Sequence, residues 1–188
     1  MQHNRKLYDN VMLRIKSPLL TILSGASNEI KFTILKHISL LLQRSPRLFD
    51  NEHKFFFCGY SDPNYLKEAK LEVLEQVATK NNMHDIISEL SEYVKDIDVE
   101  FASRSIIAIS KISTRIPEVA QHALDRLLSF LQYEVDIVSA TTILALKDIL
   151  RKYPNKANYI MSELEVWVSF NNKNKKNPIN SFLKKKDQ

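Results

Sequence analysis

The chain has 188 residues, of which 44% are hydrophobic and 26% are charged, and its formal net charge is +5. This length and composition suit one elongated helical domain rather than two compact ones. No apolar run reaches the roughly 18 to 20 residues that a membrane-spanning helix needs, and the N-terminal residues lack the apolar centre of a secretion signal. The sequence therefore predicts a protein of the cytosol or of a cytosolic membrane face.

Apolar-periodic segments begin at two sets of positions, and each set recurs at a period of about 36 residues. The first set of starts lies near Asn28, Pro63, Asp98 and Glu134. The second set lies near Pro46, Asn82, Pro117 and Pro154. A helix–turn–helix unit at a fixed period is typical of a solenoid. We therefore predict an all-α fold for residues 1–170, an α-solenoid of stacked antiparallel helix pairs of the HEAT or armadillo kind.

Three of these helices carry the same apolar stripe, with a period near 3.6 residues. The middle stripe consists of Phe101, Ser105, Ala108, Ile109, Ile112 and Ile116. The stripe one unit earlier consists of Leu66, Ala69, Val73, Leu74 and Val77. The stripe one unit later consists of Val138, Thr142, Ala145, Leu146 and Ile149. The pattern predicts one structural part used three times.

Prolines and glycines predict where the helices begin and end. Asp62 precedes Pro63, which predicts a capping side chain followed by the first helical turn, and Pro117 begins its helix in a similar way. The two glycines of the chain, Gly25 and Gly59, follow apolar runs. We predict that each ends a helix in a left-handed conformation, which glycine adopts at little steric cost.

Side chains able to perform catalysis or hold a metal lack the spacing that such chemistry needs. Cys58 follows three phenylalanines, where a thiol acts as a small apolar group rather than as a nucleophile. No metal-ligand spacing connects the five histidines, which are His3, His37, His53, His84 and His122. Core packing between repeats accounts for the aromatic side chains of Phe55, Phe56, Phe57, Tyr60 and Tyr65. We predict no metal, no cofactor and no enzymatic activity.

Much of the positive charge lies in residues 171–188, an Asn/Lys-rich stretch that we predict to be a disordered tail or insertion. Its lysines are candidates for contact with acidic lipids, and they are Lys173, Lys175, Lys176, Lys184, Lys185 and Lys186. A solvated segment is the alternative, because only Phe182 and Leu183 accompany these lysines as bulky apolar partners. Nucleic acid is not a predicted partner. Nucleic-acid binding by a solenoid would require basic residues on one helical face at the repeat period. The arginines do not keep that spacing, and they are Arg104, Arg115, Arg126 and Arg151.

Several segments resemble the trunk of β-adaptins, the large β subunits of vesicle-coat adaptor complexes. They are residues 54–67 (KFFFCGYSDPNYLK), 70–74 (KLEVL), 98–102 (DVEFA), 107–109 (IAI) and 147–156 (KDILRKYPNK). Their order and spacing are similar to those of the family, and the resemblance covers most of residues 7–165. Within the family, residues 57–63 and 124–131 (LDRLLSFL) are most similar to the β subunit of the fourth adaptor complex.

The resemblance implies a scaffold that joins a second large subunit, a medium subunit and a small subunit in a heterotetramer. Such a complex sorts cargo at trans-Golgi and endosomal membranes, which it coats from the cytoplasm as a peripheral component, and a small GTPase is a further candidate partner. The alternative is a nuclear transport receptor that binds cargo and a small GTPase, since helical repeats recur across unrelated functions. The positive net charge argues against that alternative, whose basic cargo requires an acidic inner surface.

Overall fold

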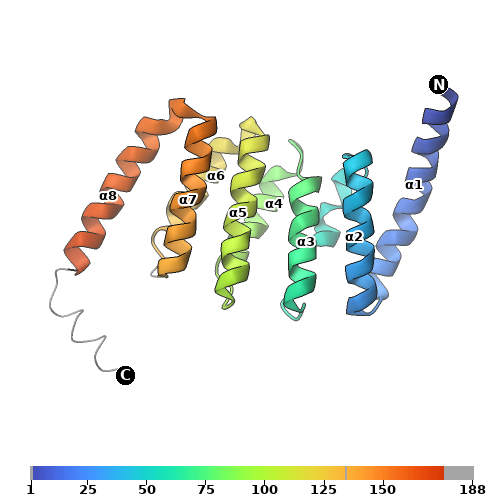
Figure 1. Cartoon of the computed structure of the whole chain (residues 1–188), viewed down its shortest axis with the longest axis horizontal. Coiled ribbons are helices and arrows are strands. Elements are labelled where there is room, and N and C mark those ends of the chain that lie inside the picture. The colour runs from blue at the N-terminus through green and yellow to red at the C-terminus, as the bar shows by residue number, and fades with distance from the viewer. Residues whose placement is uncertain (1, 134, 176–188) are drawn as a thin grey trace.

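The computed structural model describes residues 2–133 and 135–175, which form two layers of helices. The first layer contains α2 (Asn28–Arg44), α3 (Asn64–Val77), α5 (Val99–Arg115) and α7 (Asp136–Lys152). The second contains the 3₁₀ helix η1 (Asp50–Phe56), α4 (Met83–Tyr93), α6 (Ala120–Phe130) and α8 (Ala157–Lys175). Helix α1 (Gln2–Gly25) precedes α2, and the short 3₁₀ turns η2 (Pro117–Val119) and η3 (Pro154–Lys156) lead into α6 and α8. Figure 1 shows the first-layer helices side by side along the long axis, which confirms the predicted all-α solenoid.

The three predicted apolar stripes form the core between the layers. Each stripe residue is at most 7% exposed, and α5 packs against both α3 and α7. One continuous apolar cluster extends from Leu20 in α1 to Ile160 in α8. The repeat period of the sequence therefore corresponds to one helix pair added to a shared core.

Side-chain hydrogen bonds join successive repeats at sequence separations close to the period. The hydroxyl of Tyr153 donates to the backbone oxygen of Ser113 at 3.0 Å, 40 residues earlier. The indole Nε1 of Trp167 donates to the backbone oxygen of Leu131 at 2.6 Å, 36 residues earlier. Both bonds satisfy backbone carbonyls that a helix end would leave unpaired. These side chains therefore hold neighbouring units in register.

The loop before α3 differs from the prediction. Pro63 itself is the residue preceding the helix, and Asp62 does not cap it. The Oδ2 atom of Asp62 instead accepts hydrogen bonds from the backbone amide of Gly59 at 2.7 Å and from Nζ of Lys70 at 2.6 Å. An ammonium group is a stronger donor to a carboxylate than a helix amide is, so Lys70 determines where the Asp62 side chain lies.

The glycine prediction is also wrong, because no glycine in the described residues has a positive φ. Gly25 is the last residue of α1, and Gly59 lies three residues beyond the end of η1. The proline prediction is confirmed at η2 and η3, where Pro117 and Pro154 each occupy the first turn. The segment predicted to begin near Pro46 contains a turn and the single 3₁₀ helix η1 rather than a full helix.

The C-terminal stretch is partly helical. Residues 171–175 are the last residues of α8, a helix that packs against the core through Leu164 and Trp167. The disordered tail or insertion of residues 171–188 stays a prediction. Residues 176–188 lie outside the described part of the chain. Among the described helices, each is too short or too polar to cross a lipid bilayer.

Candidate interaction surfaces

The structure describes only two of the six lysines that are predicted to contact lipid. Lys173 and Lys175 belong to the last turn of α8. The other four lie outside the described residues, and they are Lys176, Lys184, Lys185 and Lys186. Lipid contact by these side chains therefore stays a prediction.

The surroundings of Cys58 favour a structural role for this residue over a reactive one. Burial raises the pKa of its thiol to about 12, which leaves almost no thiolate at neutral pH. Its backbone amide donates to the hydroxyl of Tyr93 at 2.6 Å, and its Sγ lies 3.7 Å from the backbone oxygen of Lys67. Within residues 2–133 and 135–175, no three His, Cys, Asp or Glu side chains gather closely enough to hold a metal ion.

Two nearly buried lysines of α3 hold the loops between repeats. Nζ of Lys70 donates to the backbone oxygen of Phe57 at 2.9 Å, in addition to its bond with Asp62. Nζ of Lys67 lies 2.8 Å from Oδ2 of Asp96, in the turn between α4 and α5. Both lysines belong to the segments that resemble β-adaptins, so these family-like residues act in stacking the repeats.

The aromatic cluster divides between the core and the surface. Phe56 is fully buried, as predicted for packing between repeats, but Tyr60 is 94% exposed and Phe55 is half exposed. Tyr60 lies in the loop between η1 and α3, where its side chain faces solvent, whereas Phe56 belongs to the core and Phe57 packs partly against it. The sequence pattern alone did not separate the two roles.

A groove of about 690 Å³ runs over the outer face of α2, α3 and α5. Its apolar part contains Phe32, whose ring packs edge-on against Tyr65 with centroids 5.6 Å apart, and Ile107, which is 44% exposed. Three ion pairs cross it from helix to helix, and they are Lys36–Glu72, Arg104–Glu68 and Lys111–Glu75. We refer to this surface as the outer groove.

The ion pairs of the outer groove are half-exposed, so each contributes little to stability. They leave both signs of charge at the surface beside exposed apolar side chains. A protein partner with apolar anchors and a polar rim suits such a surface, whereas a small substrate needs a closed pocket. Sequence analysis missed the groove because its residues come from three helices, at separations set by stacking.

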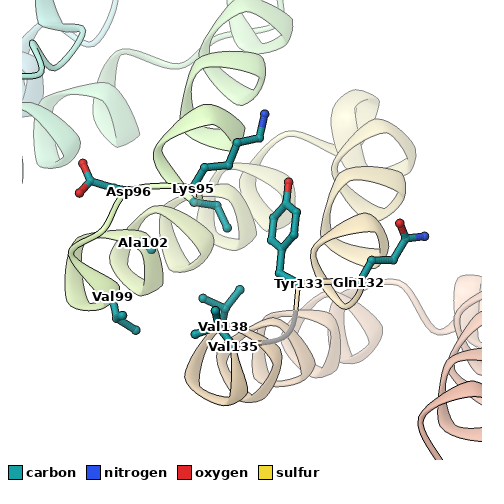
Figure 2. A pocket seen from close by; sticks show the side chains of 9 residues that line it. Lys95, Asp96, Val99, Ala102, Gln132, Tyr133, Val135 and Val138 are labelled. Atoms are coloured by element: carbon teal, nitrogen blue, oxygen red, sulfur yellow. The ribbon is translucent and has the colours of Figure 1, made fainter. Parts of the chain in front are cut away.

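A second hollow of about 470 Å³ lies where α5 and α7 begin. Figure 2 shows its side chains, which come from both helices and from the turns that precede them. Its residues are Val94, Lys95, Asp96, Val99, Ala102, Gln132, Tyr133, Val135 and Val138. The walls are mostly aliphatic, and the polar groups of Lys95, Asp96 and Gln132 extend away from the centre in Figure 2. We refer to it as the α5–α7 pocket.

The α5–α7 pocket is lined by one lysine and one carboxylate, Lys95 and Asp96. Asp98 caps α5, and its Oδ1 accepts from the backbone amides of Glu100 at 2.9 Å and Phe101 at 3.3 Å. Asp136 lies in the first turn of α7. Although burial opposes ionisation of Asp96, the hydrogen bond from Lys67 and those from backbone amides hold the pKa of that carboxyl below its usual value. The pocket therefore combines aliphatic walls with one positive and one negative side chain at its rim.

The model of the Adaptin N terminal region family matches residues 3–179 of the chain. The chain belongs to this family. It is similar to beta-adaptin-like protein A of Arabidopsis thaliana, with 44% identity over 148 residues, which are 79% of the chain and 18% of that relative. It is 35% identical to the AP-1 complex subunit beta of Dictyostelium discoideum over 169 residues, which are 87% of the chain and 18% of the relative.

The human AP-1 complex subunit beta-1 is 33% identical to this adaptin segment over 157 residues, which are 84% of the chain and 16% of the relative. The segment thus spans less than a fifth of the length of the relatives it matches. These similarities support a β-type adaptin. They agree with the structure, in which the family-like residues hold successive helix pairs together.

Proposed function

We propose that this adaptin segment belongs to a non-enzymatic scaffold subunit of a heterotetrameric adaptor complex in vesicle-mediated protein transport. The other chains of the complex would be a second large, a medium and a small subunit. The complex would act in the cytoplasm, peripherally on trans-Golgi or endosomal membranes, where it sorts cargo. A small GTPase is a further partner to seek in the same assembly.

The outer groove is the observation that carries this proposal. It presents exposed apolar side chains and both signs of charge across three parallel helices, over a rigid stacked core. Such a surface can hold one folded partner over several repeats, and it needs no catalytic group. The family match supports the adaptor function over the nuclear transport receptor, for which the relatives give no support.

The fourth adaptor complex is the paralogue that we favour. The support comes from the sequence of residues 57–63 and 124–131, as described above. In the structure these residues form the loop held by Lys70 and most of α6. Identification of the medium and small chains that accompany the full-length protein would establish the paralogue.

Two matched substitutions in the tagged full-length protein test the outer groove. Ile107 lies in the groove and is 44% exposed, whereas Ile143 lies 36 residues later on α7, outside the groove, and is 40% exposed. We expect Ile107→Asp to lower recovery of one adaptor subunit at least tenfold, and Ile143→Asp to leave recovery unchanged. Equal recovery with both variants would remove the groove from the interface, and the absence of adaptor subunits from the wild-type sample would refute the scaffold function itself.

Contact with acidic lipids is a separate proposal for Lys173, Lys175, Lys176, Lys184, Lys185 and Lys186. A lysine near an anionic membrane contributes about 1 kcal/mol to binding, so six lysines could support a measurable association. Sedimentation with anionic liposomes, with and without residues 171–188, tests this proposal. Equal binding of the two forms would end it.

A further inference from the structure

We propose that His84 of α4 and His122 of α6 together bind one Zn²⁺ or a similar divalent transition metal ion. The two imidazole rings come from successive repeats, and their centroids lie 5.1 Å apart with the ring planes at 63°. Imidazole nitrogen is a ligand that this class of ion prefers. The two histidines are a whole repeat apart in the sequence, so a search for local metal-ligand spacing could not find the pair.

The separation of the two rings is the first reason. A zinc–nitrogen bond is about 2.0 to 2.1 Å long, so a bound ion lies about 3.2 Å from the centre of each imidazole ring. Two rings that share one tetrahedral ion therefore have centroids about 5.2 Å apart. The observed separation of 5.1 Å matches this value, so rotation of the side chains would complete the site without movement of either helix.

A buried nitrogen is the second reason. Nε2 of His122 is buried, and it has no hydrogen-bond partner within the part of the chain that the structure describes. Such a nitrogen has lost its water without a replacement, which costs free energy that a metal–nitrogen bond would recover. His84 is exposed, so an ion could enter from solvent and keep water at its remaining positions.

The groups around the pair support the two rings but supply no third ligand. Lys80 and Glu118 form an ion pair four residues before the two histidines, and this pair joins the same two repeats. The charged neighbours on α6 are Asp125 and Arg126, which have opposite signs, and Oδ1 of Asp125 accepts from the hydroxyl of Tyr159 at 2.9 Å. Within the described ranges no third His, Cys, Asp or Glu joins the pair. We therefore expect weaker binding than at a structural zinc site with four protein ligands.

Calorimetric titration of the untagged full-length protein with Zn²⁺ tests the site. We expect His84→Ala and His122→Ala each to lower the affinity of one zinc-binding event at least tenfold, because a single imidazole remains. His37→Ala is the matched control, since His37 is an exposed histidine on α2, and it should leave binding unchanged. Equal zinc binding by the wild type and the two pair variants would overturn the proposal, as would the absence of zinc binding by the wild type.

Co²⁺ in place of Zn²⁺ reports the geometry of the ligands. We expect the intense visible absorption of tetrahedral Co²⁺ with the wild type and its loss in His84→Ala. A weak octahedral spectrum in both proteins would indicate an adventitious ion only and would contradict the site.

Thermal unfolding gives a third readout. Zinc that binds only the folded chain should raise the unfolding temperature of the wild type by at least about 3 °C at saturating concentration. It should not raise that of His84→Ala, whose exposed side chain can be removed without loss of folding. An equal shift in the two proteins would contradict the proposal.

Discussion

Nζ of Lys67 lies 2.8 Å from Oδ2 of Asp96 and 4.8 Å from the centroid of the Phe101 ring. The ammonium group is nearly buried, and it joins the first turn of α3 to the turn that begins the next helix pair. A buried ammonium is tolerated because a carboxylate and an aromatic face replace its water. The hydrogen bond with Asp96 raises the pKa of Lys67, so the lysine stays charged in the folded chain.

Asp96→Ala should lower the free energy of unfolding by about 3 kcal/mol, because it leaves the Lys67 ammonium buried without its carboxylate. Chemical denaturation measures this change. Glu92→Ala is the control, since Glu92 is an exposed carboxylate near the same turn, and it should have no measurable effect. Equal loss in the two variants would mean that Lys67 finds another partner.

The same pair predicts a dependence of stability on pH. The folded-state pKa of Asp96 is lowered, so its contribution is fully present above the unfolded value of about 3.9 and is lost as the pH falls through the folded value. Asp96→Asn should therefore flatten the decline in stability below about pH 4. Urea unfolding of both proteins between pH 3 and 7 measures this decline in the free energy of unfolding. Parallel curves of stability against pH would exclude the Asp96 carboxyl as a source of acid sensitivity.

Two isoleucines of α5 should differ sharply in their effect on stability. Ile109 is fully buried in the core, whereas Ile107 is 44% exposed in the outer groove. Ile109→Ala should destabilise the fold by about 2 to 5 kcal/mol, since it removes buried atoms and leaves a cavity. Ile107→Ala should change the unfolding free energy by less than about 1 kcal/mol. Similar losses from both would contradict the two-layer arrangement.

The fold was largely predictable from the sequence, because stacking repeats an apolar stripe at a constant period. The predicted residues of α3, α5 and α7 are all buried in one core. The loop at Asp62 was not predictable, since local rules favoured a helix cap while Lys70, two turns into α3, binds the carboxylate instead. The outer groove and the α5–α7 pocket were missed for a similar reason. Each is built from residues of neighbouring repeats, whose side chains meet only after the helices stack.

Cys58 should be unreactive in the folded protein. Its pKa of about 12 leaves the thiol protonated at pH 8, and the side chain is partly buried. A thiol-specific chromogenic reagent should therefore label native protein at least a hundredfold more slowly than protein unfolded in denaturant. Rapid labelling of the native chain would show that the loop of residues 57–63 opens readily.

Native mass spectrometry of the assembly captured with the tagged full-length protein tests the central claim most directly. The account predicts one heterotetramer that contains this chain, a second large adaptin, a medium subunit and a small subunit, each in one copy. Recovery of the protein alone, or with a Ran-type GTPase and nuclear cargo, would contradict it.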